Sequence, residues 1–192
     1  MDDFAVAEST RRLVILLERH CADFPCLCEE LDRHRRLSDA LAEQRERSAQ
    51  ALSAWRSALA QRWRCEVAAQ RIYADALRQL RRYYQDSPSH ARVVGPAHPD
   101  RPCTANALLQ EVLRLAATLE VLAPLPPFAA DLRANLRAAA ADLAAAIEQT
   151  ERCEAERRRL HTAERIATRM VLRASERSHR LLSQCVGEQN IC

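Results

Sequence analysis

Residues 26–86 read CLCEELDRHRRLSDALAEQRERSAQALSAWRSALAQRWRCEVAAQRIYADALRQLRRYYQD, a stretch that contains neither proline nor glycine. Proline and glycine are the residues least compatible with a helix interior. A single helix over this stretch would be about 90 Å long at a rise of 1.5 Å per residue. A helix of that length needs packing partners, so the stretch predicts a coiled coil or a helical bundle.

The composition of the whole chain favours the same class of fold. Only two of the 192 residues are glycine, and 4% are aromatic. A sheet protein needs turn residues every eight to twelve positions or so, and strands rich in valine, isoleucine and aromatic residues. We therefore predict an all-α protein, an elongated helical bundle or antiparallel coiled coil with two long helices and two shorter ones.

Prolines divide the chain into its expected segments. Phe24-Pro25 interrupts the first helix, residues 87–103 hold four prolines and one of the two glycines, and three prolines follow residue 123. Within one helical module we expect a short N-terminal helix (1–25), a long helix (26–86), a proline-rich loop (87–103), a medium helix (104–123), a proline break (124–127), a second long helix (128–186) and a frayed tail (187–192). We expect the chain to return antiparallel at the 87–103 loop.

Apolar residues at spacings of three and four mark the helix faces that should pack. The most regular set lies in 104–123, and the long helix 26–86 has its better set in its second half. Residues 138–147 read AAAADLAAAI, which predicts close approach to a neighbouring helix. The interface candidates are Leu52, Trp55, Leu59, Trp63, Leu77, Leu108, Val112, Leu115, Leu119, Leu122, Leu132, Leu136 and Leu143.

Residues 26–50 and 150–180 have polar side chains at several positions of the expected packing face. A bundle that closes on itself would fill those positions with apolar side chains. The pattern predicts a structural or scaffold subunit that assembles with other helical protein subunits. A hetero-oligomer is favoured, and a homodimer is the alternative.

A group of cysteines and histidines near the first break raises the question of a metal site: His20, Cys21, Cys26, Cys28 and His34. Zinc sites commonly use cysteine pairs separated by two to four residues, and Cys26-x-Cys28 is shorter than that. Free cysteine is also among the most buried residue types. We favour a helix-corner core over a zinc site here, and predict no cofactor.

No pattern of catalytic residues is present. All 29 basic residues are arginine, so no lysine is available for a Schiff base or a phosphate-binding loop. There is no His-Glu-x-x-His sequence, and two glycines leave little material for a tight active-site loop. The chain is predicted not to be an enzyme.

Arginine runs such as Arg35-Arg36 and Arg157–Arg159 suggest an alternative function, an arginine-rich helical module that binds nucleic acid. Arginine suits phosphate because its planar guanidinium binds two oxygens. However, acidic residues lie close to each run and the net charge is only +3. A nucleic-acid surface usually has one sign of charge, so solvated helix faces are favoured.

The N-terminus begins Met1-Asp2-Asp3-Phe4, which is acidic and unlike a secretory signal. No run of 18 apolar residues occurs, so no membrane span is predicted. With cysteines read as reduced thiols, the expected location is the cytoplasm or the nucleus.

Overall fold

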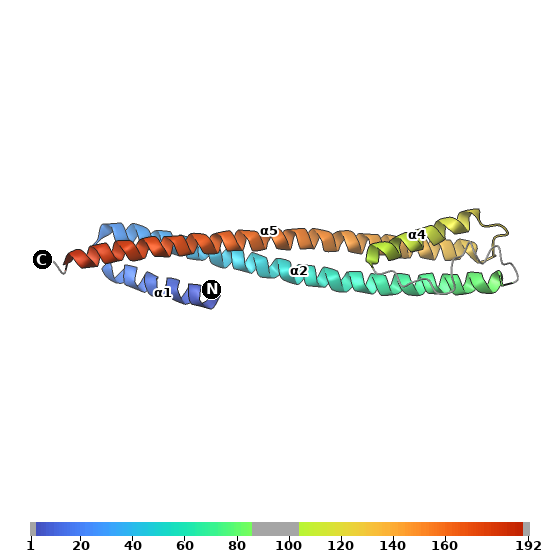
Figure 1. The fold of residues 1–192 in the computed structure, drawn as a ribbon, viewed down its shortest axis with the longest axis horizontal. Coiled ribbons are helices and arrows are strands. Elements are labelled where there is room, and N and C mark those ends of the chain that lie inside the picture. The colour runs from blue at the N-terminus through green and yellow to red at the C-terminus, as the bar shows by residue number, and fades with distance from the viewer. Residues whose placement is uncertain (1–2, 86–103, 190–192) are drawn as a thin grey trace. The chain divides into compact units, whose positions relative to one another are not determined.

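The computed structural model describes residues 3–85 and 104–189, with side chains from Glu8 to Gly187 outside that gap. Its helices are α1 (Asp3–His20), α2 (Pro25–Tyr83), α4 (Ala105–Val121) and α5 (Ala129–Gln189) (Figure 1). These ranges contain no strand, which confirms the all-α prediction. The two long helices are α2, with 59 residues, and α5, with 61. The predicted loop at 87–103 and the last three residues of the predicted tail lie outside the described residues.

Local chemistry explains the end of α1 and the starts of α2 and α4. The backbone N–H groups of Asp23 and Phe24 donate to the carbonyl of His20, both at 3.2 Å, where α1 ends. Pro25 then starts α2, a position where its missing N–H costs no helical hydrogen bond. At the start of α4, Thr104 Oγ1 accepts from the N–H of Ala107 at 3.1 Å.

The helix end predicted at Gly187 is wrong, because α5 continues to Gln189. One glycine in a helix interior costs only about 1 kcal/mol relative to alanine. That penalty is too small to stop a helix of 61 residues. A Cβ atom at position 187 would meet nothing within 4 Å, so packing does not require glycine there either.

The chain divides into two compact units: unit 1 is residues 1–52 with 156–192, and unit 2 is residues 53–155. Both long helices contribute to each unit, so each unit combines parts of α2 and α5 with one short helix. In the parts of the chain that the structure describes, no helix has an apolar stretch suited to crossing a lipid bilayer.

Unit 1 packs α1 against the first part of α2 and the last part of α5 (Figure 1). Contacts between His34 and Ser178, and between Arg45 and Glu164, show that these parts of α2 and α5 run antiparallel. Each fully buried leucine contributes about 1.5–3 kcal/mol of transfer free energy. The core consists of Leu13, Leu17, Leu27, Leu31 and Leu182.

Unit 2 packs α4 against the second part of α2 and the first part of α5, and its core is the larger of the two. Thr150 of α5 contacts Ala58 of α2, while Phe128 lies beside Tyr83, so α2 and α5 are antiparallel here as well. The alanine-rich stretch 138–147 packs inside the unit as expected, because Ala139, Ala140 and Ala146 are buried.

The direction of α4 differs from the sequence-based expectation. Tyr73 of α2 donates to Glu111 near the start of α4, and Tyr84 donates to the carbonyl of Pro124 just beyond its end, at 3.2 and 2.5 Å. The helix α4 therefore runs parallel to α2, and the predicted antiparallel return is wrong. The short connection between Val121 and Ala129 makes α4 antiparallel to α5, and α5 is already antiparallel to α2.

Candidate interaction surface

Nine of the thirteen interface candidates lie in the core of unit 2 rather than on its surface. Their relative exposure is at most 7%. Each therefore already packs against another part of the chain, and a partner could reach it only if unit 2 opened. The nine are Leu77, Leu108, Val112, Leu115, Leu119, Leu122, Leu132, Leu136 and Leu143.

The other four candidates lie on α2 outside the buried face. Leu52, Trp55 and Leu59 are half-buried, and Trp63 is 65% exposed. The buried positions nearby are small: Ala51, Ala58 and Ala69. In unit 2, Thr150 Oγ1 donates to the carbonyl of Ala58 at 3.3 Å, a contact of a side chain with the backbone of another helix. A large side chain at position 58 would prevent this approach, which explains why alanine occupies the buried face.

The polar stretches expected to receive a partner contact each other within unit 1. His34 of α2 and Ser178 of α5 are fully buried, and Glu30 is 4% exposed. His34 Nε2 lies 2.9 Å from Ser178 Oγ, which in turn lies 3.1 Å from Glu30 Oε2. These polar residues of α2 therefore lie opposite a polar residue of α5. That these stretches also receive a partner stays a prediction.

The order of these contacts differs from that of a catalytic relay. Ser178 has one hydroxyl proton, and Glu30 accepts but does not donate when ionised. That proton goes to Glu30 or to the carbonyl of Ala174, which lies 3.0 Å from Ser178 Oγ, so His34 Nε2–H is the donor to Ser178. A histidine acting as a base would instead accept from the serine, and its other nitrogen would face the carboxylate. The cluster has no exposed face for a substrate, so we interpret it as a structural polar layer.

This polar layer predicts a loss of stability in mild acid. Burial lowers the pKa of His34, against an opposing hydrogen bond to the backbone of Ala174. The charged groups facing it are Glu30, Arg33 and His179, and Arg177 pairs with Glu30. The pKa of His34 is therefore lower in the folded state than in the unfolded state. The stability that neutral His34 provides is fully present above the unfolded-state pKa. It is lost as the pH falls from the unfolded-state pKa toward the folded-state pKa.

Urea unfolding followed by circular dichroism should therefore show a midpoint that falls between pH 7.5 and pH 5. One proton accounts for at most about 1.4 kcal/mol per pH unit. His34→Gln keeps a donor toward Ser178 and should remove most of this pH dependence. His161→Gln, at an exposed position of α5 and not among the groups that act on His34, is the control and should retain it. If the urea midpoint of His34→Gln depended on pH as it does in the wild type, the assignment of the pH dependence to His34 would be contradicted.

The candidate zinc ligands do not converge. Among the described residues, no group of three or more histidine, cysteine or acidic side chains is arranged to hold a metal ion. His34 faces Ser178 instead. Cys21 packs against the core of unit 1, and Cys28 Sγ donates to the carbonyl of Cys21 at 3.0 Å. Cys26 Sγ lies 3.9 Å from Cys185 Sγ, across 159 positions of sequence.

The proximity of Cys26 and Cys185 predicts a specific disulfide in the presence of glutathione disulfide. Thiol–disulfide exchange would join the two sulfurs and release two molecules of glutathione. Hydrogen bonding to Cys21 raises the pKa of Cys28, which makes Cys28 the weaker competitor. Peptide mapping should find a Cys26–Cys185 linkage that Cys26→Ser abolishes. A dominant Cys21–Cys28 linkage would contradict this prediction.

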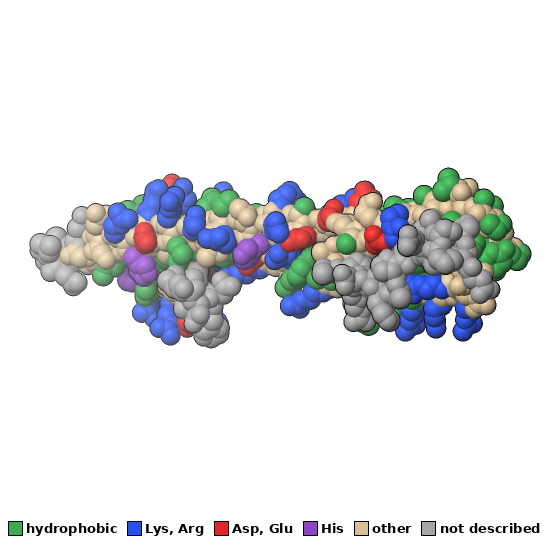
Figure 2. Space-filling model, turned by 45° about the vertical axis from the view of Figure 1, so that its right-hand side comes forward, with side chains coloured by type: hydrophobic (Ala, Val, Ile, Leu, Met, Phe, Trp, Pro, Cys, Tyr) green, Lys and Arg blue, Asp and Glu red, His purple; other side chains and the backbone are tan. Residues whose placement is uncertain are grey.

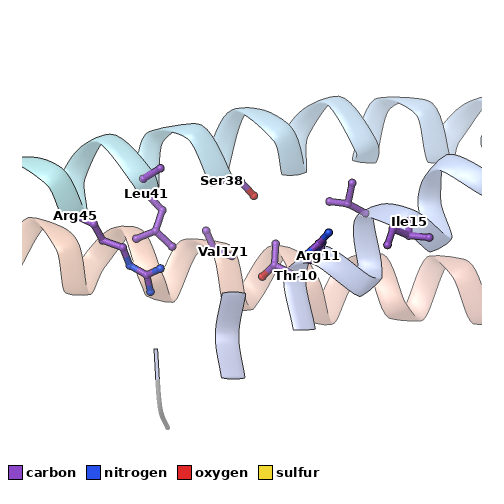
Figure 3. Close-up of a pocket in the computed structure, with 9 residues that line it drawn as sticks. Thr10, Arg11, Ile15, Ser38, Leu41, Arg45 and Val171 are labelled. Atoms are coloured by element: carbon purple, nitrogen blue, oxygen red, sulfur yellow. The ribbon is translucent and has the colours of Figure 1, made fainter. Parts of the chain in front are cut away.

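Unit 1 also contains a cavity of about 510 Å³ beside α1 (Figure 3). Val14 and Ile15 of α1, Leu41 and Ala42 of α2 and Val171 of α5 give it an apolar lining. Thr10, Arg11, Ser38 and Arg45 complete the wall, and Arg45 lies 4.0 Å from Glu164. Ser38 Oγ is buried without a hydrogen-bond partner, but one hydroxyl does not define a class of ligand.

Acidic groups pair with one arginine in each of the arginine runs. The runs Arg35-Arg36 and Arg157–Arg159, and two further clusters at Arg62 with Arg64 and at Arg78 with Arg81-Arg82, each contain an ion pair, and Figure 2 shows acidic side chains among the basic ones on the visible face. This arrangement favours solvated helix faces, because paired guanidinium groups are less available to phosphate. The pairs are Arg35–Glu18, Arg62–Glu66, Arg78–Asp75 and Arg159–Glu156.

The outer face of α4 is an exposed apolar surface of unit 2. We define it as Leu113, Ala117 and Val121, one turn apart on the side of α4 opposite its buried residues. Leu113 is 42% exposed and Val121 is 82% exposed. Figure 2 shows hydrophobic side chains gathered at one end of the molecule. Tyr83 and Leu125 of unit 2 are also exposed. Sequence reasoning missed this face, although the spacing of four between its residues was visible.

Two ion pairs border the outer face of α4. Arg114 Nη2 lies 2.7 Å from Glu111 Oε2, and Glu120 pairs with Arg137 of α5. The Arg114 guanidinium lowers the pKa of Glu111 through their hydrogen bond. The apolar face is therefore flanked by two ion pairs. An apolar centre with a charged rim is typical of a protein interface.

No protein-family model, no curated protein and no solved structure matches the chain.

Proposed function

We propose that this chain is a non-catalytic assembly subunit that binds other helical protein segments through the outer face of α4. One observation carries the proposal: α4 has apolar side chains on both of its faces. Its buried face fills the core of unit 2, while Leu113 and Val121 remain exposed. A helix that is apolar on both sides is usually covered on both sides.

The composition of α4 supports this reading. Only three of its 17 residues are charged: Glu111, Arg114 and Glu120. The long helices have many more charged side chains, and their mean hydropathy is lower. A scaffold role in the cytoplasm or the nucleus is part of the proposal, and the thiol state of the six described cysteines is compatible with it.

Site-specific photo-cross-linking tests the proposal. A benzophenone side chain at position 121 of the full chain should cross-link to a helical protein segment that mass spectrometry identifies, either in another protein or in a second copy. The same group at Gln79, an exposed polar position of unit 2, is the control and should give little product. Adding Leu113→Asp should abolish the product from position 121. Equal cross-linking from both positions, or none from either, would refute the proposal.

A further inference from the structure

The cavity of unit 1 beside α1 contains a hydroxyl group that the fold does not use. Ser38 Oγ of α2 lines the cavity and is buried without a hydrogen-bond partner among the described residues. The buried hydroxyls of Thr150, Ser175 and Ser178 each donate to the carbonyl four residues earlier on their own helix. Ser38 makes no such bond, so its hydroxyl proton is available to a ligand in the cavity.

Arg11 of α1 adds a positive charge to the wall of the same cavity (Figure 3). The other arginine of the wall, Arg45, has Glu164 4.0 Å away. Arg11 has no ion-pair partner among the side chains that the structure describes, whereas its neighbour Arg12 pairs with Glu8 at 3.0 Å. No described acidic residue lines the cavity. The wall therefore has one positive charge without a described counter-charge, and a ligand with a single negative charge complements it.

The rest of the lining is aliphatic. Leu41 is 5% exposed and Val171 is 1% exposed, so they form the inner wall, while Ile15 is half exposed at the rim. No aromatic side chain of the described residues lines the cavity, which favours a flexible aliphatic chain over a stacked ring. The volume of about 510 Å³ falls within the usual range for small-molecule sites, about 300–1,000 Å³.

We propose that this cavity binds the anion of a medium-chain fatty acid. The carboxylate pairs with Arg11 and accepts a hydrogen bond from the hydroxyl of Ser38, while the chain covers Leu41 and Val171. The ligand contacts α1, α2 and α5 at once, so it stabilises the folded form of unit 1. The site goes beyond the proposed function and does not depend on it, because the outer face of α4 belongs to unit 2.

Titration calorimetry of the full chain with decanoate measures the binding. We expect one site with a dissociation constant on the order of 10–100 µM, and a melting temperature that rises with ligand concentration. Decanol has a similar chain without the charge and should bind at least about tenfold more weakly. Acetate has the carboxylate without the chain and should give no binding at the same concentrations.

Two substitutions test the assigned contacts. Arg11→Gln should weaken decanoate binding at least about tenfold and leave decanol binding unchanged, because only the charge is lost. Arg12→Gln is the control on the same helix, since Arg12 does not line the cavity, and its affinity should stay within about twofold of the wild type. Ser38→Ala should weaken decanoate binding about three- to tenfold without lowering the melting temperature of the ligand-free protein, because no hydrogen bond of the fold is lost.

Equal affinities for decanoate and decanol, or an unchanged decanoate affinity in Arg11→Gln, would overturn the anion site. Either result would indicate partition onto exposed apolar surface. A ligand-free Ser38→Ala protein that melts well below the wild type would overturn the role of Ser38 as a donor to the ligand. No heat of binding and no rise in melting temperature with decanoate up to about 1 mM would overturn the whole proposal.

Discussion

Leu136→Ala is expected to lower the free energy of unfolding by about 2–5 kcal/mol, the usual range for removing a buried leucine side chain. Leu136 is 0% exposed and belongs to the core of unit 2, which joins α5 to both α2 and α4. The change removes buried apolar surface and leaves a cavity that three packed helices cannot easily close. Urea unfolding followed by circular dichroism measures the loss.

Leu125→Ala is the matched control in the same unit. Leu125 is 53% exposed, so the same truncation removes little buried surface. We expect a change within about 0.5 kcal/mol for this surface position. Equal losses in the two variants would contradict the assignment of Leu136 to the core.

Glu30→Ala is expected to destabilise unit 1 by about 1.5–3 kcal/mol, the range for hydrogen bonds to a charged group. Glu30 accepts from the buried hydroxyl of Ser178 and pairs with Arg177 at 3.0 Å. Without Glu30, Ser178 keeps only the carbonyl of Ala174, at 3.0 Å, as an acceptor. His34 also loses the nearby negative charge.

The neighbouring residue provides the control. Glu29 is exposed, so Glu29→Ala should change the urea midpoint little. Glu30→Gln should fall between the two variants, because it keeps an acceptor oxygen for Ser178 but loses the charge that pairs with Arg177. A midpoint for Glu30→Ala equal to that of Glu29→Ala would show that the polar layer contributes nothing to stability.

Helix positions were predictable from local signals. Pro25 begins α2, and α4 ends at Val121, shortly before Pro124, because proline acts through its own backbone geometry. The regular apolar set predicted in residues 104–123 was equally clear, and all five of its leucine and valine residues are buried. These features depend on residues close together in the sequence.

Features that depend on pairing between distant segments were harder to predict. Trp63 looked like a packing residue by size, yet small residues such as Ala58 occupy the buried face, because the adjacent helix approaches too closely for a large side chain. His34 was considered as a zinc ligand, and its actual partner is Ser178, 144 positions away in the sequence. No spacing rule within one helix contains that information.

The outer face of α4 illustrates a third limit. Leu113 and Val121 have the spacing of a helical face, and so do the buried residues of the same helix. Only the structure distinguishes the face that packs internally from the face that remains exposed. The candidate interaction surface therefore came from burial, and the sequence alone did not indicate it.

Size-exclusion chromatography with light scattering, applied to the full chain in extracts of the cells that produce it, tests the central claim most directly. Wild-type protein should elute in an assembly larger than one chain. The Leu113→Asp, Val121→Asp variant should elute as a monomer and keep the wild-type melting temperature in dilute solution. An unchanged assembly in the variant, or loss of its helical fold, would contradict the account, because those side chains would then not serve association.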